Sequence, residues 1–223
     1  MVYFADQIIA NNMLIIMRIL AFSDTHGYLP NLDLTGIDRL MIAGDITPPE
    51  LVTEAEQRPW LEYVFCPWIE ALDIPTYLVL GNHDCVGDFR APPNMRYETA
   101  GIVEDVLLFS GTPKYAGWAW EEDERTLAEY LQVILESKKK TPPIWLTHSP
   151  PWGVCDGPAN LPGYHSGSRA LLAALKACQP RLLVCGHIHA GAGCGRIDQT
   201  EIYNVSIPDR DNPWDGLPVI IEI

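Results

Sequence analysis

The sequence lacks any hydrophobic run long enough to cross a membrane, and it is poor in positive charge. Of its 223 residues, 15 are Lys or Arg and 29 are Asp or Glu, which gives a net charge of -14 at pH 7. An acidic surface repels phosphate backbones, so general binding to DNA or RNA is unfavourable. We therefore expect neither a membrane nor a nucleic acid as a partner.

Cysteine motifs, internal repeats and a secretion signal are missing as well. The six cysteines include no C-x-x-C pair, and their spacing suggests no disulfide framework. The first residues have no basic region and their apolar pattern is interrupted, unlike a signal peptide. We expect residues 1–16 to be a flexible N-terminal extension or the product of a mis-assigned start. We expect residues 17–223 to form a single domain, in a cytoplasmic setting.

Histidine, in contrast, is concentrated after short apolar runs that are typical of buried strands. Five such runs begin near Ile19, Leu40, Tyr77, Ile144 and Leu183, and each is followed by Asp, Asn or His. Five of the six histidines lie at these positions. Histidines scattered through a core or over a surface would not be distributed in this way, so the runs predict strands that present chemistry at their ends.

The order of predicted elements favours an α/β fold. Strands that alternate with helices at the start predict a partly parallel sheet covered on both faces, and later hairpins predict a second mixed sheet. The range 50–72 has helical periodicity, which Pro59 and Pro67 are expected to bend or divide. Residues 84–95 are predicted as loop, and 102–109 with 114–120 as an antiparallel hairpin.

Seven side chains at the strand ends can bind metal through oxygen or imidazole nitrogen. Asp24 and His26 are separated by one residue, so an extended turn can aim both at the same side, and His187 and His189 repeat this spacing. Such ligands without thiolate suit Mn, Fe, Zn or Ni rather than a structural zinc. Seven are too many for one catalytic ion, and they suit two ions that share a carboxylate. The seven are Asp24, His26, Asp45, Asn82, His148, His187 and His189.

Two ions in this arrangement favour displacement at phosphorus, because together they acidify a bridging water and neutralise the phosphoryl oxygens. His83 directly follows Asn82 and is the predicted donor of a proton to the leaving oxygen. The alternative for the seven ligand residues is capping and turn formation at strand ends. The coincidence of seven ligand types favours the metal interpretation.

Several neighbouring residues allow more than one interpretation. Asp84 is either a turn former or a residue that orients the site. His165 is expected on the surface. Trp118 and Trp120 are expected to pack in the core, whereas Trp152 is equally compatible with the core and with a base-stacking pocket.

Taken in order, the motifs resemble the calcineurin-like metallophosphoesterase superfamily, from about Arg18 to His189. They are Asp24-x-His26, Gly44-Asp45, Gly81-Asn82-His83-Asp84, His148 and Gly186-His187-x-His189. The resemblance implies a four-layer sandwich of two mixed β-sheets flanked by helices. It implies one metal held by Asp24, His26, Asp45 and His189, and another held by Asp45, Asn82, His148 and His187. Asp45 would bridge the two ions, which would be Mn²⁺, Fe²⁺/Fe³⁺ or Zn²⁺.

A narrower resemblance is to the metallophosphoesterase-domain (239-type brain protein) branch, which resembles class III cyclic-nucleotide phosphodiesterases. The matching segments are 23–27, 147–153, 186–189 and 203–206. Many family members carry an acid three residues after the bridging aspartate, where this chain has Pro48, so an orienting partner for His83 must come from elsewhere. The arginine that Ser/Thr protein phosphatases carry shortly after this motif is absent from residues 44–50, which argues against that subgroup.

The sequence thus predicts a dinuclear metal-dependent phosphoesterase. It would hydrolyse a small phosphodiester or phosphomonoester by attack of a metal-bridging hydroxide, with a phosphodiesterase as the first choice. The alternatives are a non-catalytic binding scaffold of the same fold and a nuclease, and the acidic surface argues against the nuclease. Monomer and homodimer are both left open.

Overall fold

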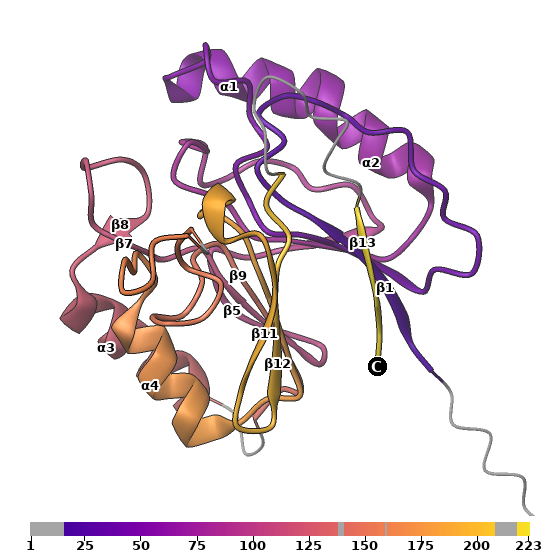
Figure 1. The fold of residues 1–223 in the computed structure, drawn as a ribbon. Coiled ribbons are helices and arrows are strands. Elements are labelled where there is room, and N and C mark those ends of the chain that lie inside the picture. Colours follow the sequence, from indigo (N-terminus) through magenta and orange to yellow (C-terminus); the bar gives the residue numbers. More distant parts are fainter. Residues whose placement is uncertain (1–15, 138–140, 159, 208–217) are drawn as a thin grey trace, which may run out of the picture.

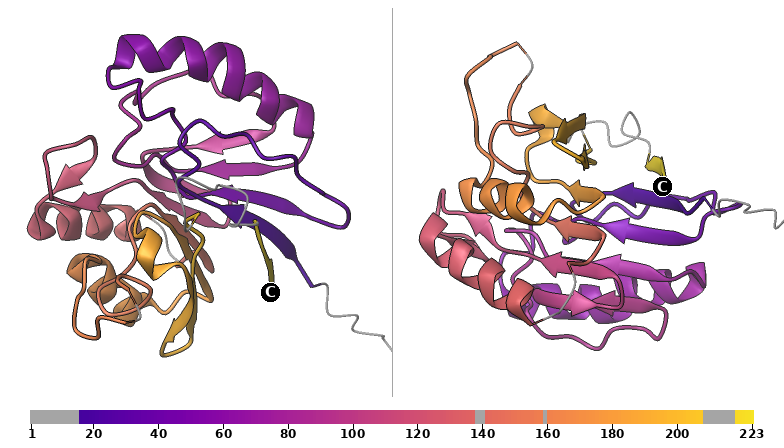
Figure 2. Two further views of the ribbon diagram at one scale, coloured as in Figure 1. Left: turned by 45° about the horizontal axis from the view of Figure 1, so that its top comes forward. Right: turned by 90° about the horizontal axis from the view of Figure 1, so that it is seen from below.

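The computed structural model describes residues 16–137, 141–158, 160–207 and 218–223. The N-terminal extension expected at residues 1–16 lies almost entirely outside these ranges. Two β-sheets face each other, and helices cover the outer face of each (Figures 1 and 2). Among the described residues, none of the helices combines the length and the apolar composition that a membrane span requires.

The first sheet has the strand order β13-β1-β2-β3-β4, in which β1 to β4 are parallel and β13 is antiparallel to β1. The second has the order β11-β12-β10-β9-β6-β5, with parallel central strands and an antiparallel strand at each edge. Both sheets are therefore mixed. The strands of the first sheet are β1 (Arg18–Phe22), β2 (Arg39–Ile42), β3 (Thr76–Leu78), β4 (Met95–Tyr97) and β13 (Val219–Glu222). Those of the second are β5 (Ala100–Val103), β6 (Val106–Phe109), β9 (Ile144–Thr147), β10 (Leu182–Cys185), β11 (Gly193–Ile197) and β12 (Thr200–Asn204).

The helices form the two outer layers. α1 (Glu54–Trp60), the π-helical segment Leu61–Phe65 and α2 (Cys66–Leu72) follow one another over the first sheet, and α3 (Glu124–Glu136) and α4 (Arg169–Cys178) cover the second (Figure 1). The division predicted in the range 50–72 takes the form of the π-helical segment. It lies between Pro59 and Pro67, which donate no backbone hydrogen bond to the helix.

Successive side chains along each buried strand point to opposite faces of the sheet, and together they fill three apolar layers. Ile19 of β1 packs between the two sheets, whereas the next residue, Leu20, packs against the helices over the first sheet. In the second sheet, Leu146 faces the space between the sheets and Trp145 faces α3 and α4. Four layers of secondary structure thus enclose three layers of core, which confirms the predicted sandwich of two mixed sheets flanked by helices.

The predicted hairpin of 102–109 with 114–120 is wrong. The actual hairpin covers 100–109 and so overlaps the first of these ranges, where β5 and β6 are joined by a turn at Glu104. Glu104 adopts φ 56, and no Gly or Asn marks the turn, so the apolar run concealed it. Residues 114–120 form a loop between the short parallel strands β7 (Thr112–Pro113) and β8 (Glu121–Glu122). β4, at the end of the predicted loop 84–95, was not expected.

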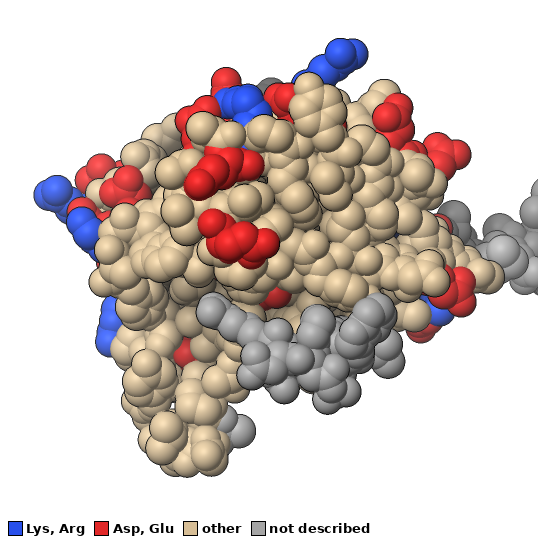
Figure 3. All heavy atoms as spheres, turned by 90° about the horizontal axis from the view of Figure 1, so that it is seen from above, with Lys and Arg blue, Asp and Glu red and all other residues tan. Residues whose placement is uncertain are grey.

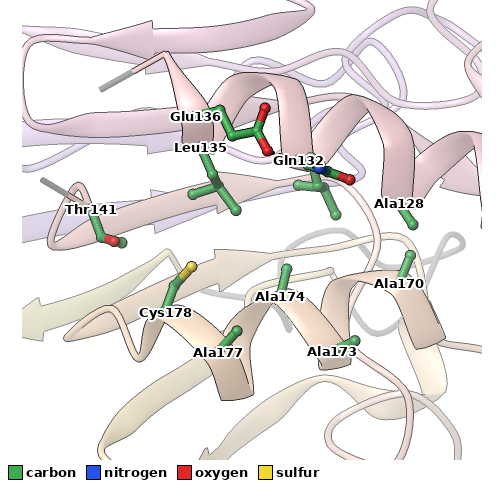
Figure 4. Close-up of a pocket in the computed structure, with 11 residues that line it drawn as sticks. Ala128, Gln132, Leu135, Glu136, Thr141, Ala170, Ala173, Ala174, Ala177 and Cys178 are labelled. Carbon is green, nitrogen blue, oxygen red and sulfur yellow. Dashed lines mark hydrogen bonds between the residues drawn. The ribbon is translucent and has the colours of Figure 1, made fainter. Parts of the chain in front are cut away.

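The helices over the second sheet begin at side-chain caps. Asp123 accepts hydrogen bonds from the first turn of α3, and Ser168 does the same for α4. Glu124 accepts the N–H groups of Arg169 and Ala170, which ties the start of α3 to the start of α4. Between the two helices lies a cavity of about 410 Å³, whose lining includes five alanines (Figure 4).

Candidate metal centre

The seven predicted ligands and His83 lie on turns at the carboxyl ends of five parallel strands. Because parallel strands end at the same edge of a sheet, and the two sheets pack face to face, these turns meet. The first sheet supplies Asp24 and His26 after β1, Asp45 after β2, and Asn82 and His83 after β3. The second sheet supplies His148 after β9, and His187 and His189 after β10.

Six of the ligand side chains gather into two clusters, in each of which the ligand atoms lie within 4.8 Å of one another. Asp24, His26 and His189 form cluster 1, and Asp45, His148 and His187 form cluster 2. Asp45 faces both, because its Oδ2 lies 3.7 Å from Nε2 of His148 and 4.0 Å from Nε2 of His26. A single carboxylate is thus placed between the two sets.

Asn82, the seventh predicted ligand, joins cluster 2 through His148. Nδ1 of His148 lies 2.7 Å from the carbonyl oxygen of Ala43, so this nitrogen carries the proton and donates it to that oxygen. In the neutral ring Nε2 of His148 then carries the lone pair, and it lies 3.0 Å from Oδ1 of Asn82. Two acceptor atoms that face each other in a buried place fit a cation between them.

His189 repeats this arrangement in cluster 1. Its Nδ1 lies 2.7 Å from the carbonyl oxygen of Ile207, which leaves the Nε2 lone pair 3.5 Å from Oδ1 of Asp24. Among the described residues, that oxygen is a buried carboxylate atom that accepts no hydrogen bond. A buried charged oxygen without a donor is costly, and a cation would satisfy it.

Burial sets the protonation of the site. Burial, with a smaller contribution from the like charge of His148, lowers the pKa of His187 to about 3. Its imidazole is therefore neutral near pH 7 and can donate a lone pair. Burial alone would raise the pKa of Asp24, but the positive charge that His148 and His189 carry when protonated outweighs it, so the pKa is lowered and the carboxylate is ionised. Neutral imidazoles and ionised carboxylates are the forms that bind a metal.

The backbone of the site adopts conformations that L-residues rarely occupy. Asp24, His26, Asp45 and His187 have φ values of 60, 45, 53 and 69. Left-handed conformations cost free energy at residues with a Cβ, and they concentrate at functional sites. Here they turn the side chains back toward the strand ends, where the ligands meet.

Glycines before the ligands allow the turns to approach closely. A Cβ at Gly81 would lie 2.1 Å from Oδ1 of Asp45, and one at Gly186 would lie 2.0 Å from Oγ of Ser23. Both distances are far below van der Waals contact. The glycine that precedes Asn82 and the one that precedes His187 are therefore needed to let these turns meet Asp45 and the turn after β1.

Asp84 orients the site. Its carboxylate is buried and accepts hydrogen bonds from the N–H groups of Ile46 and Thr47 and from the N–H of Gly81. It therefore joins the turn that carries Asp45 to the turn that carries Asn82. Of the two interpretations that the sequence left open, the structure supports the orienting one.

His83 lies beside cluster 1, with its ring centroid 5.0 Å from that of His26. Its N–H donates to Oδ1 of Asp45 at 2.8 Å, and its carbonyl oxygen accepts from Nε2 of Gln57 at 2.6 Å. Gln57, a fully buried residue of α1, also accepts the N–H of Cys85. No sequence signal pointed to Gln57, because it lies within an ordinary helical pattern.

The tryptophan expectations are partly wrong. Trp120 packs against the core as expected, and its Nε1 donates to the carbonyl oxygen of Asp84. Trp118 is not a core residue, because it is 46% exposed, and its ring centroid lies 4.1 Å from that of His83. The loop that carries it was predicted as a strand, which hid its place beside the site.

Trp152 and His165 belong to the long loop before α4. The guanidinium carbon of Arg169 lies 3.6 Å from the centroid of the Trp152 ring, and the His165 ring lies 5.2 Å from it. Nδ1 of His165 lies 2.9 Å from Oδ1 of the buried Asp156, which also accepts the N–H groups of Gly153 and Gly167. These contacts order the loop rather than add a ligand to either cluster.

A family model described as calcineurin-like phosphoesterase matches residues 17–191. Among curated proteins, UPF0046 protein K07C11.7 of Caenorhabditis elegans is 22% identical over 232 residues, which cover 93% of this chain and 75% of that protein.

Two solved structures have similar folds. The protein TT1561 of Thermus thermophilus has a TM-score of 0.54 at 17% identity, over 86% of this chain and 89% of that chain. The phosphopantetheinyl hydrolase of Mycobacterium tuberculosis has a TM-score of 0.55 at 15% identity, over 91% of this chain and 95% of that chain. At these identities the likeness concerns the fold alone.

Proposed function

The chain belongs to the calcineurin-like phosphoesterase family, and from this premise we propose that it hydrolyses a small phosphoester at a dinuclear metal centre. The observation that carries the proposal is the place of Asp45, whose Oδ2 faces both ligand clusters. A carboxylate in this position can be shared by two cations. A protein that served only as a scaffold would not need such an arrangement.

The two clusters fit divalent cations, and we propose Mn²⁺, Fe²⁺/Fe³⁺ or Zn²⁺ because the ligands are oxygen and imidazole nitrogen. When bound, the two cations acidify a water molecule and offset the negative charge of the phosphoryl oxygens. Asp24, His26, Asp45 and His189 would hold one cation, and Asp45, Asn82, His148 and His187 would hold the other.

The chain's own side chains complete the chemistry. The Nδ1 protons of His148 and His189 are fixed on backbone carbonyl oxygens, which aims both Nε2 lone pairs into the site. His83 would give a proton to the leaving oxygen. Its backbone is held on both sides, by Asp45 and by Gln57, so the segment that carries the ring is fixed before substrate binds.

We propose a phosphodiester as the preferred substrate. The support is the narrower sequence resemblance, carried by segments such as 147–153, to the branch that resembles class III cyclic-nucleotide phosphodiesterases. A single domain from residue 17 onward and a cytoplasmic setting are parts of the same proposal.

A nuclease is disfavoured by charge. The net charge is -14, and acidic side chains lie across the face shown in Figure 3, so a long polyanion would be repelled. A small ester carries little charge and needs only the metal centre to attract it. We expect the protein to hydrolyse small phosphoesters and not to cleave single-stranded or duplex DNA.

The test uses metal-reconstituted protein. With Mn²⁺, Fe²⁺ or Zn²⁺ it should release nitrophenol from bis(p-nitrophenyl) phosphate, and elemental analysis should find two ions per chain. His83→Ala should lower kcat about 10²- to 10⁴-fold while both ions stay bound, as expected for loss of a general acid. Asp45→Asn should lower the occupancy of both sites, because both depend on its carboxylate.

Two matched variants control for general damage. His165→Ala removes a described histidine that lies outside both clusters, and Asp73→Asn changes an exposed aspartate with the similar φ of 49. Both should keep turnover and metal content. Full activity of His83→Ala would exclude its role as the acid. Two ions bound without turnover of any ester would favour the non-catalytic scaffold instead.

A further inference from the structure

A cavity of about 510 Å³ opens beside His83. This volume is within the range of pockets that bind small organic molecules. Its apolar lining includes Pro49, Leu51, Val52 and Trp118, and neither Asp, Glu, Lys nor Arg is among its described lining residues. The cavity therefore suits an uncharged group, in contrast to the charged clusters next to it.

Trp118 is the largest side chain of this cavity, and it is 46% exposed. Its ring lies 4.1 Å from the ring of His83, centroid to centroid, with an angle of 49° between the planes. An indole left open to solvent at the edge of a reactive site offers a flat apolar surface to a ligand. Aromatic stacking of this kind tolerates many ring structures but disfavours short aliphatic groups.

The loop that carries Trp118 is held in place by one carboxylate. Oε2 of Glu121 accepts the N–H groups of Tyr115, Ala116, Gly117 and Trp118 at distances from 2.7 to 3.2 Å. Burial raises the pKa of Glu121, but these four hydrogen bonds outweigh it, so the net shift is downward and the carboxylate stays ionised at neutral pH. The backbone that carries the indole is thus held in place before any ligand arrives, which lowers the entropic cost of binding.

We propose that this cavity binds the leaving group of the phosphoester and that Trp118 selects a flat, uncharged ring in that position. The proposal rests on the phosphoesterase function proposed above. If His83 protonates the leaving oxygen, the group attached to that oxygen lies on the His83 side of the phosphorus, where the cavity is. The oxygen of a water molecule forms a new bond to phosphorus while the P–O bond to this group breaks. The proton of His83 passes to the departing oxygen, a hydroxyl compound leaves, and a proton from water restores His83.

The test compares a phenyl ester with a methyl ester. For the Mn²⁺-loaded protein we expect a higher kcat/KM for methyl phenyl phosphate than for dimethyl phosphate, a preference that partly reflects the better leaving group. The change in kcat/KM caused by replacing Trp118 separates the contribution of the cavity from that of the better leaving group. Trp118→Ala should lower kcat/KM about tenfold for the phenyl ester and less than about twofold for the methyl ester, and Trp118→Phe should restore most of the loss.

A binding measurement separates this inference from the proposed function. Calorimetry with phenylphosphonate and methylphosphonate needs no turnover, and the wild type should bind the phenyl compound about tenfold more tightly. Trp118→Ala should remove that preference. Tyr63→Ala, which removes an exposed aromatic side chain outside the cavity, should leave it unchanged.

The outcomes are distinguishable. Equal losses for both esters in Trp118→Ala would overturn the selective role and show that the indole only positions His83. Turnover without any phenyl preference in binding would overturn this inference and leave the proposed function standing. Phenyl-selective binding without turnover of any ester would overturn the function and leave an aromatic binding site.

Discussion

At Gly81 the site has no room for a methyl group. A Cβ there would lie 2.1 Å from Oδ1 of Asp45 and 2.6 Å from Cε1 of His148. Both of these side chains would have to move, and both belong to cluster 2. The site therefore depends on the absence of a methyl group as much as on the ligands.

We expect Gly81→Ala to lower metal occupancy and to destabilise the protein by about 1–3 kcal/mol, the usual cost of overpacking. Elemental analysis and urea denaturation would measure the two effects. Gly101→Ala in β5 is the matched control, because its Cβ would meet the nearest atom at 3.7 Å, and it should change neither quantity much. Full metal content in Gly81→Ala would show that Asp45 and His148 can move without losing the ions.

For single residues, the sequence predicted which side chains gather at the site better than it predicted their backbone conformations. The clustering of Asp24, His26 and His189 followed from their positions after apolar runs, because parallel strands end at one edge. The left-handed φ of His187, 69, had no sequence signal, because histidine carries no preference strong enough to reveal it. Gln57 and Trp118 also escaped prediction, since their roles depend on contacts between segments far apart in the chain.

Among the elements, the loop between β7 and β8 was the least predictable. Its sequence, 114–120, was expected to form a strand, but four of its N–H groups donate to Glu121 instead of to a neighbouring strand. A carboxylate that accepts several backbone donors competes with sheet formation. By contrast, the division of the helical range 50–72 was predicted, because Pro59 and Pro67 are visible in the sequence.

Glu121→Gln tests this loop through its pH dependence. Because the pKa of Glu121 is lowered below 4.5 in the folded chain, its contribution to stability is fully present above pH 4.5. That contribution is lost as the pH falls through the folded pKa. We expect the variant to be less stable than wild type by about 1 kcal/mol at pH 7, a modest value because solvent screens the carboxylate.

Urea denaturation of both proteins from pH 7 to pH 3 would measure the difference, which should shrink as the solution is acidified below pH 4.5. Hydrogen exchange at the amides of 115–118 should be faster in the variant at pH 7. A stability difference that stayed constant over the whole pH range would mean that the charge of Glu121 is not what holds the loop.

In the molecule as a whole, the metal site lies where the two sheets meet. Each cluster takes ligands from both: in cluster 1, Asp24 and His26 belong to turns of the first sheet, and His189 to the second. Hydrogen bonds cross the same boundary, from Nδ1 of His148 to Ala43 and from the N–H of His187 to Asp24. A cation bound at either cluster would therefore connect the two halves of the sandwich.

Removal of metal should accordingly destabilise the whole domain. At a free metal concentration about 100 times Kd, binding adds about 2.7 kcal/mol per site to the free energy of unfolding, and chelation with EDTA should remove it. Denaturant titrations with and without EDTA would measure the change. His83→Ala should respond as wild type does, whereas Asp45→Asn should respond much less. Identical midpoints with and without EDTA in the wild type would contradict a cation that links the sheets.

The loop between β7 and β8, whose N–H groups donate to Glu121, contributes none of the predicted metal ligands. If Trp118 selects the leaving group as proposed, the choice of substrate and the cleavage of the bond depend largely on different parts of the chain. A library that varies residues 116–119 and keeps Glu121 should therefore yield variants with altered substrate preference that still hydrolyse phosphoesters. This loop is thus a suitable starting point for engineering.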